Sequence, residues 1–256
     1  MMQWVGQGIR TGIKTTVYPA QPETAAGTSP GLPIGGVYPG NEIESLVGNC
    51  PTQALSEQGN QICVDSRRCV HCYRCERQMA TPLAWSRTYE WASANYSSDL
   101  RRNFGNEFYR SLHLLVVDAG DCGACLHEVK QLNNPYYNMD RLGFFLTPTP
   151  RHADVLLVVG PVTDHMRVGL QKTYEAMPTP KRVVAVGACA LSGGVFGPSF
   201  VSESGVARVI PVDVEVPGQP PPPLAILHGL LVAVGRKEPA SLVSLAKTES
   251  AAAGAR

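Results

Sequence analysis

The stretch LHLLVVDAGDCGACLHE, residues Leu112–Glu128, decides how this chain folds. It begins with a run that is apolar except for His113, Leu112–Val117, and we expect a strand buried on both faces there. Small residues follow, and Cys122 and Cys125 lie among them at CxxC spacing. A helical pattern over Leu126–Leu132 comes next. The stretch therefore predicts a strand that delivers two thiols in a tight turn at its carboxyl end, where open α/β sheets bind ligands.

Strand and helix patterns alternate from residue 108 to residue 236. The predicted strands are His113–Val117, Asp154–Val159, Arg182–Val186 and Arg208–Val212, and the predicted helices are Leu126–Leu132, His165–Glu175 and Pro223–Val234. This alternation predicts an α/β fold with a mostly parallel, doubly wound sheet of flavodoxin-like type. Cys189 follows the third strand, so its thiol is expected at the same sheet edge as Cys122 and Cys125. A lone CxxC also fits a redox disulfide or zinc.

A second group of cysteines lies upstream, in CPTQALSEQGNQICVDSRRCVHCYRC, residues Cys50–Cys75. The stretch resembles the middle of a bacterial two-cluster ferredoxin, in which each cluster takes three cysteines from a CxxCxxC run and a fourth from a distant Cys-Pro. The resemblance implies a small α+β ferredoxin-like domain that holds one 4Fe–4S cluster through Cys50, Cys69, Cys72 and Cys75, with a hairpin between the first two. Zinc is the rival ligand, because four thiolates would satisfy it. The CxxCxxC run packs three ligands more tightly than the paired CxxC spacing of zinc ribbons.

The other ferredoxin cluster has no ligands in this chain. The four positions that would hold it are occupied by Gly40, Ile43, Leu46 and Met79. Random erosion would scatter losses over both sites, so this pattern indicates that one cluster was deleted as a unit. Cys63 stands where the ferredoxin pattern has an apolar residue, and it is expected to be a small buried hydrophobe.

Three further motifs occur in order at natural βα spacings: VVDAGDCGACLHEV, PRHADVLLVVGPVT and VVAVGACALSGGVFG. Together they resemble the small electron-transfer subunit of membrane-bound nickel–iron hydrogenases, formate hydrogenlyases included, and the B subunit of respiratory complex I. The resemblance covers residues 108–236. It implies a second 4Fe–4S cluster beside a large catalytic subunit.

The ligands of this second cluster match the family at three positions of four. Cys122, Cys125 and Cys189 correspond to family cysteines, whereas Gln219 stands in VPGQPPPP, Val216–Pro223, where the family has its fourth. Four outcomes stay open: a 4Fe–4S cluster with the Gln219 amide or a water on the fourth iron, a 3Fe–4S centre, a ligand from a partner, or an empty site. A neutral ligand removes negative charge, which should raise the reduction potential.

Glu128 is the candidate for proton transfer. In the hydrogenases an acidic residue near this turn takes part in proton movement, and Glu128 follows the CxxC directly. The alternative is a helix-start acid favoured by the helix dipole. No nucleophile–base set, P-loop or GxGxxG occurs in the sequence, so neither a catalytic residue nor a nucleotide site is expected.

Composition and sequence pattern indicate the cellular compartment and give no support for some classes of partner. The chain has 22 basic and 21 acidic residues, so its net charge gives no argument for nucleic acid. No apolar run reaches the ~18 to 20 residues of a membrane helix, and the N-terminus lacks a secretory pattern. A cytoplasmic protein is expected, held at the cytoplasmic face of the inner membrane only through partner subunits. Its eight cysteines then suit metal or cluster binding better than disulfides.

Five segments are expected along the chain. They are an extended arm and linker (1–39), the ferredoxin-like single-cluster domain (40–80), an aromatic connector (81–107), the flavodoxin-like domain (108–236) and a flexible tail (237–256). The arm is expected to lie on a partner subunit, with a free tail as the alternative. The connector aromatics Trp85, Tyr89 and Trp91 either pack in a core or position the two domains.

The resemblances imply an iron–sulfur electron-transfer subunit of a membrane-associated oxidoreductase of the hydrogenase or complex I type. Electrons would pass between the ferredoxin-type cluster and a cluster next to the large catalytic subunit, and membrane-arm subunits would be indirect partners. The alternative from a different class is a structural or assembly subunit whose second cluster is lost.

Overall fold

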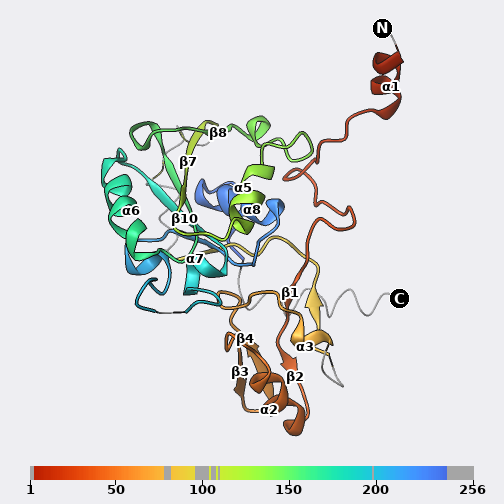
Figure 1. Ribbon diagram of the computed structural model, residues 1–256. Coiled ribbons are helices and arrows are strands. Elements are labelled where there is room, and N and C mark those ends of the chain that lie inside the picture. The colour runs from red at the N-terminus through yellow and green to blue at the C-terminus, as the bar shows by residue number, and fades with distance from the viewer. Residues whose placement is uncertain are drawn as a thin grey trace.

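A six-stranded sheet forms the larger part of the protein (Figure 1). The computed structural model describes residues 3–77, 82–95, 104, 108, 110–197 and 199–240. In spatial order the strands are Ser93–Ala94 (β6), Val214–Val216 (β11), Arg182–Val186 (β10), Val155–Val159 (β9), Leu112–Asp118 (β7) and Phe144–Leu146 (β8). All neighbours are parallel except β6, which is antiparallel to β11. Counted from β7, the parallel strands have the order 2-1-3-4-5 of flavodoxin-like folds, so the predicted fold class is confirmed.

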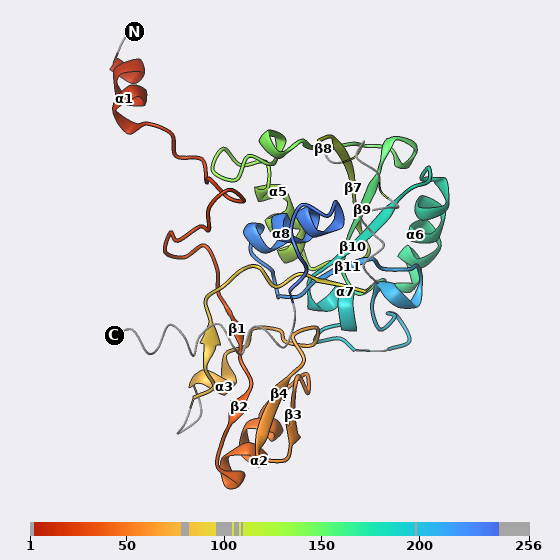
Figure 2. The same ribbon diagram turned by 180° about the vertical axis from the view of Figure 1, so that it is seen from behind.

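Helices cover both faces of this sheet (Figure 2). They are Ala124–Gln131 (α5), Asp164–Ala176 (α6), Ala188–Ser192 (α7) and Pro223–Ala233 (α8), with short 3-10 turns at Met139–Leu142 (η1), Pro150–His152 (η2) and Val206–Arg208 (η3). Alternate residues of each strand point to opposite faces. In β9, Val155 and Val159 pack with α5 and α8, while Leu156 and Val158 pack with α6 and α7. Both faces of β9 are therefore buried, which is why it reads as an unbroken apolar run. The expectation that β7 is also buried on both faces is met only in part, because His113 is exposed and Leu115, Val116 and Val117 are half-buried.

The predicted strand Arg208–Val212 is wrong. Its start forms the 3-10 turn η3, and the last parallel strand begins later, at Val214. Val206 and Ile210, four residues apart, are both buried against α6 and α7, and the Ile210 N–H donates to the Val206 carbonyl at 3.0 Å. Pro211 then has no N–H for a sheet ladder. The helical spacing of the apolar residues therefore determines the local structure, although several of them are β-branched and would favour a strand.

A small module lies below the sheet in Figure 1. It contains the strands Gly36–Val37 (β2), Leu55–Gln58 (β3) and Gln61–Val64 (β4), and the helices Gly40–Gly48 (α2) and Arg74–Arg77 (α3). The strands form one antiparallel sheet in the order β2-β4-β3, and the predicted hairpin between Cys50 and Cys69 is β3–β4.

The core of the small module is apolar where the second ferredoxin cluster would lie. Ile43 and Leu46 are fully buried and pack with Leu55, Ile62 and Leu83. Met79, the fourth of these positions, lies outside the described residues. Cys63 is half-buried on β4 and faces Ser56 of β3 across the ladder.

The arm and the connector run between the two parts of the protein. Gln3–Thr11 (α1) has no buried residue, and Figure 1 shows it projecting away from the body. Leu32–Pro33 (β1) pairs antiparallel with Trp85–Ser86 (β5). In the connector, Trp91 is fully buried in the core beneath α8. The connector residues Tyr96, Arg101 and Arg102 and the chain after residue 240 lie outside the described residues.

The described helices give no membrane-spanning candidate. Across the parts of the chain that the structure describes, no helix combines the length and the apolarity that a bilayer crossing requires.

Candidate metal centres

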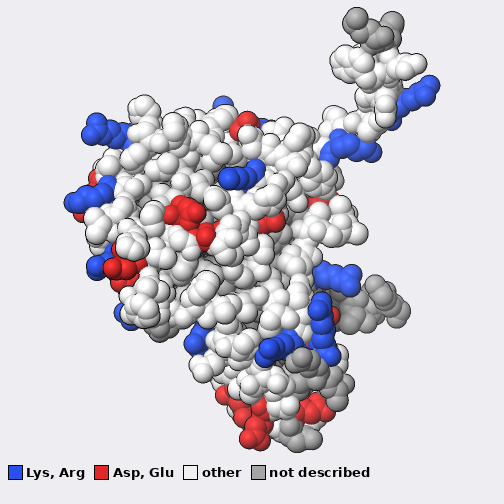
Figure 3. Space-filling model, viewed as in Figure 1, with Lys and Arg blue, Asp and Glu red and all other residues white. Residues whose placement is uncertain are grey.

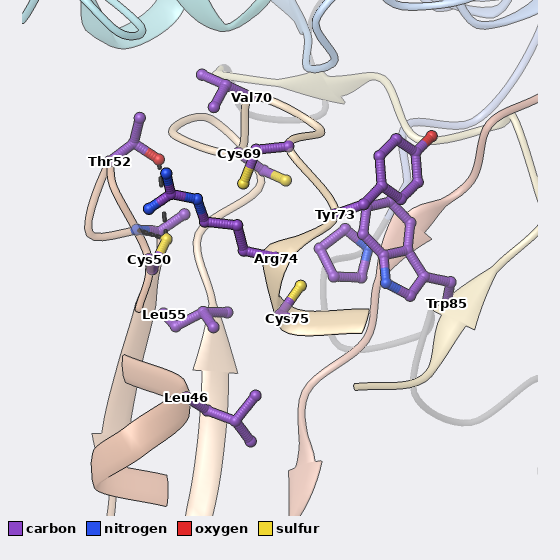
Figure 4. A pocket seen from close by; sticks show the side chains of 13 residues that line it. Leu46, Cys50, Thr52, Leu55, Cys69, Val70, Tyr73, Arg74, Cys75 and Trp85 are labelled. Atoms are coloured by element: carbon purple, nitrogen blue, oxygen red, sulfur yellow. Dashed lines mark hydrogen bonds between the residues drawn. The ribbon is translucent and has the colours of Figure 1, made fainter. Parts of the chain in front are cut away.

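The first candidate site brings four predicted cysteines to one hollow (Figure 4). Cys50 follows α2, whereas Cys69, Cys72 and Cys75 come from the loop after β4 and the start of α3. All four thiols line the same hollow in the small module, together with apolar side chains such as Leu46. The hairpin β3–β4 supplies the reversal that returns the chain from the first cysteine to the other three.

The backbone around these thiols is held in uncommon conformations. His71 and Tyr73, which lie between the cysteines of the run, have φ angles of 52° and 59°. Non-glycine residues in the left-handed region cost energy and gather at ligand-binding loops. The Ala54 N–H donates to the Cys50 sulfur at 3.2 Å. Hydrogen bonds to cluster sulfurs are among the features that set the potential of iron–sulfur sites.

Burial holds two of these thiols in the neutral state when no cation is present. It raises the pKa of Cys69 to about 12, with repulsion from the neighbouring thiols adding to the effect. It raises the pKa of Cys75 to about 11 for the same reasons. Iron would supply the positive charge that thiolates need here, so loading the site should release protons.

Basic side chains surround the first site. The loop and α3 contain Arg67, Arg68, Arg74 and Arg77. Figure 3 shows blue side chains gathered near the junction of the small module and the sheet, and red ones at the far tip, where α2 and β3 lie in Figure 1. The positive charges near the hollow favour an anionic group there, as a thiolate-bound cluster is.

The second candidate site lies at the carboxyl edge of the large sheet. The turn after β7 is fixed by two carboxylates: Asp118 accepts from the Gly120 and Asp121 N–H groups at 2.9 and 2.7 Å. Asp121 in turn accepts from the N–H groups of Gly123 and Leu126 at 3.0 and 3.1 Å. The second carboxylate thereby satisfies N–H groups at the start of α5. The protein's own hydrogen bonds thus define the conformation of the turn that contains the CxxC.

Three predicted site residues meet at this edge. Cys125 and Cys189 are both buried. The Gln219 amide lies between them: its Nε2 donates to the Cys189 sulfur at 3.4 Å, and its Oε1 accepts from the Cys125 thiol at 4.0 Å. Cys122 is exposed and is close enough to act electrostatically on both buried thiols. The structure thus places Gln219 beside two of the three predicted cysteine ligands.

Two glycines make room for the buried sulfurs. A Cβ at Gly187 would lie 2.5 Å from the Cys125 sulfur, and one at Gly194 would lie 2.7 Å from the Cys189 sulfur. Both glycines have positive φ, 92° and 58° respectively. The two glycines thus form a cradle in which the cysteine sulfurs occupy the space that a glycine-replacing side chain would fill.

Burial also dominates the electrostatics of the second site. It raises the pKa of Cys125 far above the usual range of a thiol, and the nearby Asp121 adds to the shift. It raises the pKa of Cys189 as well, although the hydrogen bond from Gln219 acts in the opposite direction. As at the first site, thiolates at these positions require a cation.

Glu128 lies on a hollow that adjoins both sites. This second hollow is lined by His71 and Tyr73 from the cysteine loop of the small module, and by Glu128 and Gln219 from the large sheet. Burial raises the pKa of Glu128, partly offset by His127. The His71 Nε2 atom is buried without a hydrogen-bond partner. The proton-transfer candidate and the atypical ligand position therefore share one polar space.

Among the described residues, no three His, Cys, Asp or Glu side chains are grouped so as to hold one ion.

The sequence did not reveal which residues join the two sites. Arg67, beside the cysteine run, contacts Glu215 of β11 at 2.8 Å, and Ser192 of α7 donates to the Arg67 carbonyl at 3.0 Å. One signal was present: Glu215 is a charged residue within the apolar stretch before VPGQPPPP. A buried carboxylate requires a partner, although the sequence could not say which.

The strand order and the cysteines at the carboxyl edge of the sheet define a flavodoxin-like α/β protein with a thiol-lined site. The family model for the NADH ubiquinone oxidoreductase, 20 Kd subunit, matches residues 122–233. The chain belongs to this family, and the small module lies outside the matched residues.

Relatives come from archaea and bacteria. An uncharacterized protein of Methanocaldococcus jannaschii is 48% identical over 122 residues, which are 48% of this chain and 82% of that protein. The probable membrane-bound hydrogenase subunit mbhJ of Pyrococcus furiosus is 45% identical over 125 residues, 49% of this chain and 75% of that protein. Formate hydrogenlyase subunit 7 of Escherichia coli is 39% identical over 129 residues, 50% of this chain and 51% of that protein. The predicted family is confirmed.

Proposed function

We propose that this chain is an iron–sulfur electron-transfer subunit of a membrane-associated oxidoreductase complex of the hydrogenase or complex I type. A ferredoxin-type 4Fe–4S cluster would be held by Cys50, Cys69, Cys72 and Cys75. A second cluster would be held by Cys122, Cys125 and Cys189, with Gln219 at the fourth position. When bound, the two clusters supply one-electron redox chemistry, and the protein supplies burial, hydrogen bonds and spacing.

The observation that carries this proposal is the presence of two separate thiol sets in one chain. Residues that neighbour each set, His71 and Tyr73 for the first and Gln219 for the second, line one hollow. Thiols are the ligands that iron–sulfur clusters use. The first set has the N–H···S hydrogen bond at Cys50, and the second has the glycine cradle around Cys125 and Cys189. Clusters fit both donor sets.

The partners follow from the family. The named relatives are subunits of a membrane-bound hydrogenase and of a formate hydrogenlyase. The cluster at the sheet edge would face a large catalytic subunit, and membrane-arm subunits would hold the complex at the cytoplasmic face of the inner membrane. Glu128 would move protons near that interface.

One observation favours the second candidate, a structural or assembly subunit with an empty second site. The Gln219 amide already contacts Cys125 and Cys189, so both thiols have a polar partner without any metal. In that case, only the first of the two sites would hold a cluster.

Iron and sulfide counts on this subunit, purified anaerobically and free of its partners, separate these possibilities. About eight irons per chain indicate two 4Fe–4S clusters, about seven a 3Fe–4S centre at the second site, and about four an empty one. Low-temperature EPR then assigns each cluster. We expect about eight or seven irons. A count near four supports the structural or assembly subunit, and a chain with zinc or no metal overturns both proposals.

A further inference from the structure

The small module and the large sheet meet at one charged contact next to the cysteines of both sites. The Arg67 guanidinium contacts Glu215 Oε1 at 2.8 Å. Arg67 is two residues before Cys69, and Glu215 is four residues before Gln219 in the chain. The Glu215 side chain is only 3% exposed, whereas that of Arg67 is 45% exposed. A buried carboxylate in the large sheet is thus neutralised by a cation from the small module.

The same arginine makes a second contact through its backbone. Ser192 Oγ lies 3.0 Å from the Arg67 carbonyl and 3.0 Å from the Ala188 carbonyl of its own helix, so its proton is shared between the two acceptors. Ser192 ends α7, the five-residue helix that contains Cys189. A path from Cys69 to Cys189 therefore consists of two peptide units, one hydrogen bond and one helical turn. Both views of the fold place α7 directly beside the small module (Figures 1 and 2).

Other groups at this contact orient Glu215 without replacing Arg67. Asn95 Nδ2 donates to the same Glu215 Oε1 at 2.8 Å, but it is neutral. On Arg67 itself, the backbone N–H donates to Asp65 at 3.0 Å, which fixes the loop. Removing one member of a buried charge pair is strongly unfavourable, because the other charge stays buried without its partner.

We propose that Arg67 is a positioning residue that holds the two cluster sites at a fixed separation. The inference rests on the proposed electron-transfer function. Electron transfer between clusters slows steeply as their separation grows, so a contact that sets the separation also sets the rate. Arg67 needs no contact with either cluster for this role, because it acts through Glu215 and Ser192.

Arg67→Met, in the full chain with its partner subunits, tests the proposal. Arg68→Met is the matched control, since Arg68 is also exposed and also loses one positive charge beside Cys69. Arg68 contacts Gln53 of its own module at 3.4 Å and makes no contact of the Arg67 kind with the large sheet in the described residues. Any purely electrostatic change in the potential of the first cluster should therefore be similar in the two variants.

Three measurements separate positioning from a general structural role. Hydrogen–deuterium exchange of residues 65–72 and 188–194 reports docking of the modules. Pulsed EPR reports the magnetic interaction between the reduced clusters. Rapid-freeze EPR after photoreduction by deazaflavin reports the rate of electron equilibration. In Arg67→Met we expect roughly ten- to hundredfold less protection of these residues from exchange, the factor in the docking equilibrium for losing a charge-assisted hydrogen bond. The magnetic interaction should be weaker and electron equilibration slower, because the clusters lie farther apart on average.

The controls define which outcome overturns which proposal. Arg67→Lys keeps the charge and should restore most of the rate. Ser192→Ala, a milder variant should Arg67→Met fail to fold, should change all three measurements in the same direction by less. If Arg67→Met matches Arg68→Met in exchange and rate while both clusters are present, the positioning proposal is wrong and the proposed function stands. If the wild-type complex has iron at fewer than two sites, the proposed function and this inference both fall.

Discussion

The two candidate centres of this chain are built on different kinds of scaffold. The first lies on a loop of a small module, where His71 and Tyr73 adopt left-handed backbone conformations between the cysteines. The second lies at the carboxyl edge of a buried parallel sheet, where the turn after β7 is fixed by carboxylates. The loop site has all four cysteines, whereas the sheet site has three cysteines and Gln219.

This difference teaches that scaffold and ligand can change independently. At the sheet edge the VPG and PP residues around Gln219 are those of the family turn, and the Gln219 amide reaches both buried thiols. Gln219 thus lies where the family resemblance predicts the fourth ligand, beside two of the three predicted cysteines. In the small module, Ile43 and Leu46 stand at two positions where the ferredoxin resemblance predicts ligands of a second cluster, and they pack in an apolar core.

The largest expected effect comes from the loop site. Cys69→Ser should remove its cluster and lower the iron content from about eight to about four per chain, because a buried serine cannot replace the thiolate. Iron and sulfide analysis measures the change. Cys63→Ser is the control and should keep all the iron. Equal iron loss in both variants would show that Cys63 belongs to the site.

The sheet site should respond to a change that leaves every ligand in place. Gly187→Ala introduces a Cβ 2.5 Å from the Cys125 sulfur at a φ of 92°, so Cys125 must move. We expect loss of iron from the second site alone and a decrease of roughly 1–3 kcal/mol in the free energy of unfolding. Gly169→Ala, on the exposed side of α6 with open space around it, should instead stabilise by about 0.5–1 kcal/mol. Full iron content in Gly187→Ala would contradict a cluster bound by Cys125.

Giving the second site four cysteines, as the first site has, should change the reduction potential of the second site and little else. Gln219→Cys supplies a fourth thiolate, whose negative charge stabilises the oxidised cluster. The reduction potential of the second site should fall, on the order of 100 mV, judging by the effect of neutral ligands in other clusters. An EPR-monitored redox titration measures it, with the loop cluster as internal reference. An unchanged potential at the second site would exclude Gln219 from its coordination.

The smallest expected effect is a pH dependence at Glu128. Burial raises the pKa of this carboxyl in the folded protein, so the unfolded chain ionises first, near pH 4.3. As pH rises above that value, the unfolded state releases protons that the folded state retains, and stability decreases until the folded carboxyl also ionises. Glu128→Gln should therefore raise the free energy of unfolding by roughly 0.3 kcal/mol at neutral pH, a small value for a half-exposed group.

The measurement for Glu128 is urea unfolding across pH. The gain in Glu128→Gln should vanish below about pH 4, where the carboxyl is protonated in both states. Glu57→Gln, at an exposed position on β3, controls for the loss of one negative charge. A gain that persists at acid pH would show that burial of the charge is not its cause.

The sequence predicted the parallel sheet well because its central strands are mostly apolar and mostly buried. The run at β9 is apolar throughout, β10 is apolar after Arg182, and β7 is apolar except for His113 and Asp118, with the CxxC turn following β7. The edge strands β6 and β8 were not predicted, since each has three residues or fewer and too little pattern to detect. The start of β11 was misplaced because Val206 to Val212 contains β-branched residues whose apolar spacing is helical.

The candidate ligands could be named from spacing and resemblance, but their environment could not. The contact of Arg67 with Glu215 joins residues far apart in the chain, and only tertiary structure brings them together. The same holds for the hollow that His71 shares with Glu128. Gln219 contacts two thiols because of the backbone path of the VPGQPPPP turn. That path cannot be derived from the sequence of the turn alone.

The apolar core around Ile43 and Leu46 has a consequence for how the protein matures. A small module whose stability came only from its clusters would stay unfolded until iron arrived. Here five apolar side chains already hold α2 and the hairpin together, so half of the module can form before any cofactor is delivered. The newly made chain can then offer a partly folded module to the iron–sulfur assembly machinery. Only the cysteine loop remains to fold around the incoming cluster.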